Sequence, residues 1–185
     1  MKLIVAGTGA SGMPYLIRAL DYLKLRRELE VYLILSRAAV LVLNKEMGIS
    51  EEEVAGKATK YYREEDIYAP IASGSFSVDG MVVLPCSTKT LSAISNGFSD
   101  NLISRAAEVT LKERRRLILV VRETPLSLVD IENMKNVTLA GAIVMPASPA
   151  FYGRPKTIED VIDFVVGRAL SLLGVKNELY REYEG

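Results

Sequence analysis

The first twelve residues constrain the fold of this 185-residue chain more than any other part of it. An apolar run over 2–6 leads into a glycine-rich turn at 7–12, and a helix-type pattern then extends over 13–29. This order suits the binding of a phosphate, because glycines let the backbone approach an anion and a helix N-terminus offers free N–H groups with partial positive charge. The spelling Gly-x-Gly-x-x-Gly also fits the dinucleotide fingerprint. The motif alone leaves both dinucleotides and mononucleotides open.

The end of the second strand separates these two nucleotide classes. Residues 31–35 form an apolar run that predicts a buried strand of a parallel sheet. An NAD-dependent enzyme would usually place an aspartate or glutamate directly after this strand, where it binds the ribose hydroxyls. The chain has Ser36 and Arg37 there, and Glu30 lies at the opposite end of the strand. The feature favours a mononucleotide such as FMN over NAD.

Strand-type and helix-type segments alternate along the rest of the chain. Further strands are expected over 60–66, 80–84, 116–121 and 140–145, and further helices over 37–46, 101–114 and 158–173, with helix starts after Ser50 and at 87–90. Right-handed crossovers between such elements give an α/β fold, a doubly wound, Rossmann-like three-layer sandwich with a mostly parallel sheet. We expect residues 1–185 to form a single FMN-binding domain.

The overall charge and composition exclude several classes of protein. The chain carries 23 basic and 23 acidic residues, a balance that gives no support to a nucleic-acid or membrane-surface role. No apolar run approaches the ~20 residues that span a bilayer, and the first residues are expected to be a strand and not a signal peptide. The single cysteine, Cys86, excludes an intrachain disulfide and a multi-cysteine zinc site. We therefore expect a cytoplasmic protein.

The chain contains no histidine, which limits the chemistry it can perform. Ser-His-Asp and Cys-His arrangements are excluded, as are histidine metal ligands and an imidazole base, so we expect no metal. Cys86 has no histidine partner and follows an apolar strand, so we expect a small buried residue and not a nucleophile. Proton transfer is left to Glu, Ser, Tyr, the substrates or water.

Polar groups gather at the positions where the expected strands end. Ligands of open parallel sheets bind beyond the carboxyl ends of the strands. Those ends carry hydroxyl groups, one lysine and one arginine with few acids, at 9–11, Ser36, 86–90, 122–125 and 146–152. Such groups suit a ligand that bears a phosphate.

Several sequence blocks match one enzyme family in their order and spacing. They are GTGASG at 7–12, LSRAA at 35–39, ASGS at 72–75, PCSTKTLS at 85–92, DNLISRAAEVTLKERRR at 100–116, VRETPL at 121–126 and PASPAFY at 146–152. With these blocks the chain resembles the UbiX-like flavin prenyltransferases, a branch of the flavin-dependent Cys-decarboxylase-like fold. The resemblance implies transfer of a dimethylallyl group from dimethylallyl monophosphate to N5 and C6 of reduced FMN without a metal. The product, prenylated FMN, would be used by a UbiD-like decarboxylase.

The resemblance also implies roles for individual residues. FMN contacts are expected from Gly9, Ala10, Ser11, Ser36, Ser87, Thr88, Lys89, Thr90 and Arg122. Contacts with the prenyl donor are expected from Arg105, Lys112, Tyr152 and Arg168. Catalytic roles are expected for Ser11, Glu46, Glu123 and Lys112. Because the family supplies these groups from more than one subunit, the resemblance implies a homo-oligomer, a dodecamer built from trimers.

Structural roles and other functions compete with this interpretation. Ser36 could serve only as a helix cap, Glu46 could be a solvated helix residue, and Arg122 could pair with Glu123. One alternative function is a flavin-dependent cysteine-type decarboxylase of the same fold, a branch that relies on an active-site histidine. The other is a non-catalytic FMN-binding protein, which would have no use for a basic second pocket. The sequence also leaves open whether the donor is the mono- or the diphosphate.

We predict that the purified protein binds FMN and does not bind NAD. The reason is Ser36, which stands where a dinucleotide enzyme would carry its ribose-binding acid. Fluorescence titration with both ligands checks this expectation. Tight binding of NAD without binding of FMN would contradict it.

Overall fold

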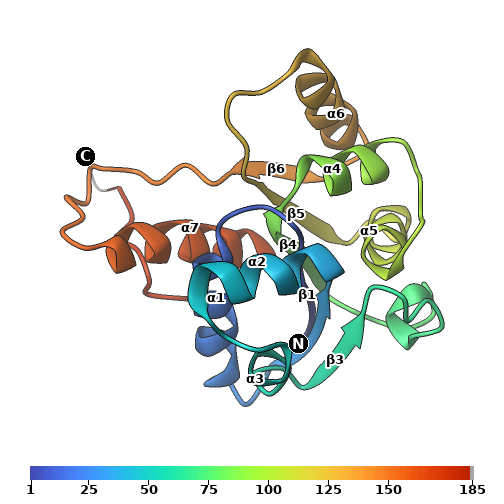
Figure 1. Cartoon of the computed structure of the whole chain (residues 1–185), viewed down its shortest axis with the longest axis horizontal. Coiled ribbons are helices and arrows are strands. Elements are labelled where there is room, and N and C mark those ends of the chain that lie inside the picture. Colours follow the sequence, from blue (N-terminus) through green and yellow to red (C-terminus); the bar gives the residue numbers. More distant parts are fainter. Residues whose placement is uncertain (184–185) are drawn as a thin grey trace.

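A sheet of six parallel strands forms the centre of the computed structural model, which describes residues 1–183 (Figure 1). The strand order is β3-β2-β1-β4-β5-β6, and every neighbouring pair is parallel. The strands are β1 (Lys2–Gly7), β2 (Glu30–Leu35), β3 (Lys60–Arg63), β4 (Gly80–Cys86), β5 (Arg116–Val121) and β6 (Ile143–Pro146). The doubly wound fold expected from the sequence is confirmed, with an all-parallel sheet where a mostly parallel one was expected.

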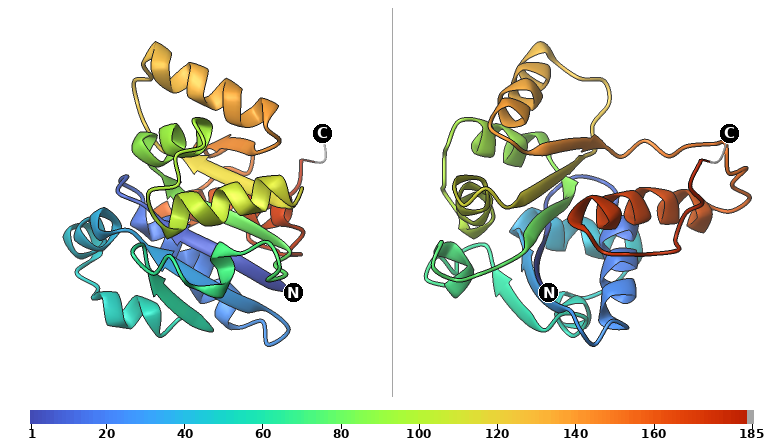
Figure 2. Two further views of the ribbon diagram at one scale, coloured as in Figure 1. Left: turned by 90° about the vertical axis from the view of Figure 1, so that its right-hand side faces the viewer. Right: turned by 180° about the vertical axis from the view of Figure 1, so that it is seen from behind.

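Helices cover both faces of the sheet and complete three layers (Figures 1 and 2). One face is covered by α1 (Met13–Lys24), α2 (Arg37–Met47), α3 (Glu51–Ala55) and α7 (Ile158–Leu173). The other face is covered by α4 (Thr88–Ser95), α5 (Leu102–Lys112), α6 (Leu128–Leu139) and the short 3-10 helix η1 (Pro70–Ala72). Within residues 1–183, no helix combines the length and apolar character that a membrane crossing requires.

The strands are apolar along their whole length because both faces of the sheet are covered. Leu3 and Val5 of β1 belong to the core on the α1 and α7 side, while Ile4 and Ala6 belong to the core on the α4 and α5 side. All four side chains are fully buried. This alternation follows from the two-residue period of a strand. It explains why the apolar runs alone predicted β1, β2, β4 and β5.

An ion pair joins the two long helices on one face. The Arg18 guanidinium on α1 donates from Nε to Asp163 Oδ1 at 2.5 Å and from Nη2 to Asp163 Oδ2 at 3.0 Å. Two parallel hydrogen bonds fix the relative orientation of the planar groups. The pair therefore helps to set the position of α7, the helix that carries Arg168.

Several elements differ from the expectations of the sequence. The strand expected over 60–66 ends at Arg63, because a turn follows in which the Asp66 N–H donates to Arg63 O. Helix α1 ends at Lys24, five residues earlier than expected, and residues 25–29 form a turn in which the Leu29 N–H donates to Arg26 O. Strand β6 starts at Ile143, because Ala140 closes the preceding helix. That helix, α6, was not expected. Its exposed surface carries the apolar residues Leu128, Val129, Ile131 and Leu139, so its sequence lacks a clean polar face.

The strand order places a crevice at one edge of the sheet. Helix α1 follows β1 on one face, and α4 follows β4 on the other face. Since β1 and β4 are neighbours, the chain diverges in opposite directions beyond their carboxyl ends. Open α/β sheets bind ligands at such a switch point.

Candidate functional site

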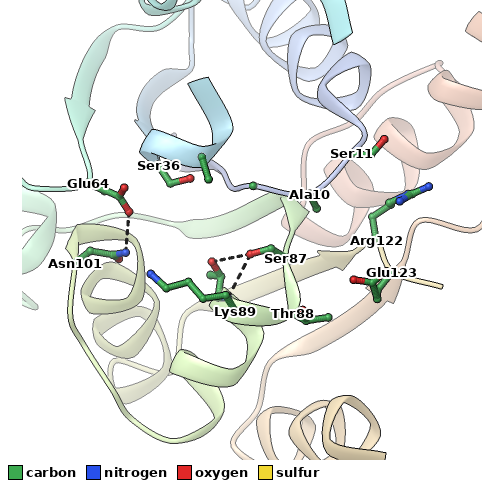
Figure 3. A pocket seen from close by; sticks show the side chains of 13 residues that line it. Ala10, Ser11, Ser36, Glu64, Ser87, Thr88, Lys89, Asn101, Arg122 and Glu123 are labelled. Carbon is green, nitrogen blue, oxygen red and sulfur yellow. Dashed lines mark hydrogen bonds between the residues drawn. The ribbon is translucent and has the colours of Figure 1, made fainter. Parts of the chain in front are cut away.

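A pocket of about 360 Å³ lies in this crevice (Figure 3). It is lined by all nine residues that the sequence analysis expected to hold FMN, namely Gly9, Ala10, Ser11, Ser36, Ser87, Thr88, Lys89, Thr90 and Arg122. Its volume falls within the range of about 300–1,000 Å³ that is usual for small-molecule sites. The pocket thus joins residues that lie up to 114 positions apart, from Gly9 to Glu123.

Backbone hydrogen bonds beyond the strand ends hold these turns in place. The Ser36 N–H donates to Gly7 O at 3.1 Å, and the Arg122 N–H donates to Cys86 O at 3.2 Å. Each bond continues the parallel ladder by one step past the strand, so both side chains start from a fixed backbone. The carboxyl ends of the strands therefore fix the positions from which the Ser36 and Arg122 side chains enter the pocket.

The connection between β1 and β4 depends on the side chain of Thr8. The Thr8 backbone N–H donates to Pro85 O at 3.2 Å, and its hydroxyl donates to the same oxygen at 2.8 Å. Pro85 has no N–H to offer in return. The Thr8 hydroxyl instead accepts from the Ser87 N–H at 2.8 Å. Thr8 is 1% exposed and does not line the pocket, yet it ties its first and third turns together.

Three helix N-termini reach the pocket through their capping residues. Ser36 caps α2 by accepting from Ala39 N at 3.0 Å, Ser87 caps α4 by accepting from Thr90 N at 3.3 Å, and Asn101 caps α5 by accepting from Ser104 N at 3.0 Å. Each helix contributes partial positive charge at this end. The capping and ligand-binding interpretations of Ser36 are compatible, because a hydroxyl that accepts from its own helix still has a hydrogen to donate.

Two positively charged side chains, those of Lys89 and Arg122, line the same pocket. Lys89 extends along the pocket from the start of α4, and Arg122 points to the opposite end of the pocket beside Ser11 (Figure 3). Lys89 lies 3.3 Å from Asp100, and its side chain remains 69% exposed. Hydroxyls, helix ends and two cations form a donor set that fits a flavin bearing a phosphate.

The N-terminus of α1 differs from the expectation that its N–H groups are free for a phosphate. The Glu46 carboxylate of α2 accepts from the Gly12 N–H at 3.0 Å and from the Met13 N–H at 2.9 Å. The next residue is Pro14, which has no N–H, and the Tyr15 N–H donates to Gly12 O. The first turn of α1 is therefore satisfied within the protein, and its N–H groups are not free for a phosphate.

Glu46 does not line the pocket itself but is hydrogen-bonded to Ser11, which lines it. The alternative of a merely solvated helix residue does not describe Glu46 either, because its carboxylate accepts from two N–H groups of the first turn. Burial alone would raise the pKa of its carboxyl group, but hydrogen bonds from the Ser11 side chain and from the Met13 and Gly12 N–H groups outweigh burial and lower that pKa. Glu46 is thus a carboxylate at neutral pH that holds the Ser11 turn.

Two positions of the first turn require glycine, each for a different structural reason. A Cβ at Gly9 would lie 2.5 Å from the Ala38 Cβ, so the turn can pack against the start of α2 only without a side chain. Gly12 has a φ of 120°, a conformation that residues with a side chain rarely adopt. The glycine pattern therefore shapes the pocket wall in addition to leaving room for a ligand.

Glu64 and Asn101 line the pocket although the sequence analysis did not single them out as ligand contacts. One Glu64 oxygen accepts from the Arg37 N–H at 2.7 Å, and the other accepts from Asn101 Nδ2 at 2.9 Å. Glu64 directly follows β3, so the rule that ligands bind beyond strand ends could have identified it. Asn101 could have been found as a capping residue before an apolar helical run.

Arg122, Glu123 and Cys86 occupy the strand ends on the other side of the pocket. Among residues 1–183, no carboxylate lies within 4.0 Å of the Arg122 guanidinium, so the possible ion pair with Glu123 is not formed. Glu123 accepts from the Thr124 N–H at 2.9 Å and lines the pocket. Burial raises the pKa of the Cys86 thiol to about 12. A neutral thiol in this position is a poor nucleophile.

The residues expected to bind the prenyl donor do not line this pocket. Arg105 and Lys112 lie on α5, where Arg105 donates from Nε to Ala72 O at 3.2 Å and pairs with Glu108 at 3.0 Å. Tyr152 lies in a second cavity between the segment after β6 and the C-terminal segment. Arg168, on α7, contacts Tyr180 of that C-terminal segment. A single chain therefore assembles the expected FMN residues but leaves the donor residues in two other places.

The chain was compared with known proteins. The Flavoprotein family model matches residues 1–170. Flavin prenyltransferase UbiX from Methanocaldococcus jannaschii is 49% identical over 183 residues, which cover 99% of this chain and 98% of that protein. AnUbiX (PadA1), solved in complex with FMN and dimethylallyl pyrophosphate, has a TM-score of 0.95 at 45% identity and covers 100% of this chain and 97% of its own. A dodecameric FMN-dependent UbiX-like decarboxylase from Escherichia coli O157:H7 has a TM-score of 0.97 at 42% identity, with 100% of both chains covered.

We predict that Thr8→Val destabilises the protein and weakens FMN binding, whereas Thr8→Ser preserves both. Valine keeps the shape but leaves the Ser87 N–H without its acceptor, which costs about 1–3 kcal/mol for a buried donor. Urea unfolding measures the stability, and fluorescence titration measures the affinity for FMN. Wild-type behaviour of Thr8→Val would show that the hydroxyl does not hold the two turns together.

Proposed function

The chain belongs to the Flavoprotein family and, within it, to the UbiX-like flavin prenyltransferases, and on this premise we propose that it transfers a dimethylallyl group to N5 and C6 of reduced FMN. The observation that carries the proposal is the convergence of nine expected FMN contacts on one pocket. The relatives named as flavin prenyltransferases support it over the full length of the chain. The solved relative that contains both FMN and dimethylallyl pyrophosphate supports the pairing of these two ligands.

Reduced FMN, when bound, supplies the nucleophilic nitrogen and the ring carbon that receive the dimethylallyl group. The helix ends at Ser36, Ser87 and Asn101 and the ammonium of Lys89 would bind its phosphate and fix its orientation. Ser11 would lie near its reacting edge, held by Glu46. The fixed turns spare the enzyme from reorganising these groups during the reaction.

Positive charge would promote departure of the donor phosphate. Arg122, Lys112 and Arg168 are cations, and Tyr152 offers a hydroxyl, so together they can stabilise negative charge that grows on the leaving group. Arg122 is free of carboxylates within residues 1–183, which leaves its guanidinium available for two parallel hydrogen bonds to a phosphate. Removal of the proton from C6 would fall to Glu123, Ser11 or the departed phosphate.

The separation of the donor residues supports an active site that is shared between subunits. The pocket of a single chain is lined by none of the four residues expected to bind the donor, which are Arg105, Lys112, Tyr152 and Arg168. Tyr152 lines a different cavity. We propose a homo-oligomer, a dodecamer built from trimers, in which neighbouring chains complete each site. A relative described as dodecameric supports this assembly. Use of the product by a UbiD-like decarboxylase and a cytoplasmic location stay predictions.

Mass spectrometry of the flavin tests the proposed function. The protein is incubated with reduced FMN and dimethylallyl monophosphate, and the flavin is then released. A flavin that has gained one dimethylallyl unit, with release of inorganic phosphate, supports the proposal. An unchanged flavin would favour a non-catalytic FMN-binding protein, and decarboxylation of a peptidyl cysteine would favour the decarboxylase of the same fold.

We predict that prenyl transfer is insensitive to chelators. Within residues 1–183, no group of three or more His, Cys, Asp or Glu side chains is arranged to hold a metal ion, and the donor phosphate is expected to meet Arg, Lys and Tyr side chains instead. Turnover is measured before and after treatment with EDTA. Loss of turnover in EDTA that Mg²⁺ restores would show that a metal binds the donor phosphate.

We predict that Arg168→Ala impairs use of the prenyl donor far more than binding of FMN. Loss of one charge-assisted contact with a phosphate costs about 1.5–3 kcal/mol, which corresponds to a fall of roughly 10- to 150-fold in kcat/KM. Steady-state kinetics with varied donor and a separate FMN titration measure the two effects. Unchanged donor kinetics, or loss of FMN binding instead, would place Arg168 outside the donor site.

A further inference from the structure

The C-terminal segment Asn177–Arg181 contacts both residues that are expected to bind the donor phosphate on this side of the molecule. Arg168 Nη1 donates to the Tyr180 hydroxyl at 3.0 Å, and the guanidinium lies 5.5 Å from the centre of the Tyr180 ring. The Tyr152 hydroxyl donates to Arg181 O at 3.3 Å. One short segment therefore determines the positions of two side chains that come from different parts of the chain.

This segment is attached to α7 by specific contacts. Asn177 Nδ2 donates to Gly167 O at 3.0 Å, to Ser171 Oγ at 3.1 Å and to Val175 O at 3.2 Å. A Cβ at Gly167 would lie 2.6 Å from the Tyr180 ring and 2.8 Å from Asn177 Oδ1, so the close approach requires glycine in the helix. The C-terminal segment and the loop after β6 also lie side by side in Figures 1 and 2.

The Tyr180 hydroxyl has two hydrogen-bond partners, Arg168 and Ser171. Because Arg168 can only donate, the Tyr180 oxygen accepts from it, and the hydroxyl hydrogen can point to Ser171 Oγ at 3.3 Å. When Ser171 is instead the donor, its hydrogen bond and that of Arg168 lower the pKa of Tyr180, although burial opposes this shift. The Tyr180 ring is itself held by an edge contact with Phe164, with 5.6 Å between ring centres.

Arg168 keeps most of its binding capacity in this arrangement. Within residues 1–183, no carboxylate lies within 4.0 Å of its guanidinium. Only one of its five N–H groups is used by Tyr180, and a planar guanidinium that rests on an aromatic ring has little freedom to rotate. The arrangement orients the cation without neutralising it.

We infer that Tyr180 is a positioning residue of the prenyl-donor site, which holds the Arg168 guanidinium ready for the donor phosphate. The inference rests on the proposed function, because it takes Arg168 as a donor contact. A long flexible side chain that is ordered in advance loses less entropy when it binds its ligand. Tyr180 therefore acts on donor affinity through Arg168 and has no direct part in FMN binding.

The test compares Tyr180→Phe with wild type in two measurements. Calorimetric titration of dimethylallyl monophosphate into protein loaded with oxidised FMN gives the donor affinity without turnover, and steady-state kinetics with reduced FMN gives kcat and KM. We expect donor affinity to fall about tenfold, in line with loss of a hydrogen bond to a charged group, and KM to rise more than kcat falls. The matched control is Tyr68→Phe, which removes a hydroxyl from a residue that is 96% exposed and is expected to behave as wild type.

A double mutant separates positioning from other roles of Tyr180. If Tyr180 acts through Arg168, Tyr180→Phe has no further effect on kcat/KM in an Arg168→Ala background. Additive losses, or wild-type donor affinity in a folded Tyr180→Phe protein, would overturn the inference. If Tyr180→Phe does not fold, Ser171→Ala removes the second partner of the Tyr180 hydroxyl together with an acceptor of Asn177, and unchanged donor affinity in this variant would overturn the inference. Should wild type bind the donor without prenylating FMN, the proposed function fails, while the effect of Tyr180→Phe on donor affinity still decides the inference.

Discussion

The divergence of the chain at the carboxyl ends of β1 and β4 is the constraint on which the rest of the structure depends. Parallel strands bring all their carboxyl ends to one edge of the sheet, and a crevice opens where successive helices leave for opposite faces. The two turns that border this crevice are joined by one buried hydroxyl, that of Thr8. The Thr8 hydroxyl donates to Pro85 O and accepts from the Ser87 N–H, so the position of Ser87 follows from β1 as much as from its own strand.

Helix ends around the crevice have a structural task and line the pocket proposed for FMN. Ser36 and Ser87 satisfy N–H groups of their own helices, and both line the pocket. The Ser87 hydroxyl donates its hydrogen to the Thr90 hydroxyl at 3.2 Å. The first helix is the exception, since the Glu46 carboxylate occupies its N–H groups. A glycine-rich turn followed by a helix therefore does not by itself identify the anion site. The capping residues of α2, α4 and α5, and not the α1 N-terminus, line the pocket here.

Features that depend on local sequence were predictable, and features that depend on tertiary contacts were not. The buried strands follow from their apolar runs, and the nine pocket residues follow from strand ends together with the family motifs. Helix α6 was not predicted because its exposed face is also apolar. Its sequence therefore lacks the alternation of apolar and polar residues that indicates a helix. The contact of Glu46 with the α1 N-terminus joins residues 34 positions apart, and Tyr180 meets Arg168 only because Gly167 admits the C-terminal segment.

The raised pKa of the buried Cys86 thiol has a consequence for the electrostatics of catalysis. Side chains that change charge near neutral pH are chiefly histidines and cysteines with lowered pKa values. The chain has no histidine, and its single thiol has a pKa of about 12. A phosphate monoester, in contrast, loses its second proton at about pH 6. Between mildly acidic and neutral solution neither a histidine nor a thiol changes the charge of this protein, and the substrates themselves carry the ionisation that tunes their binding.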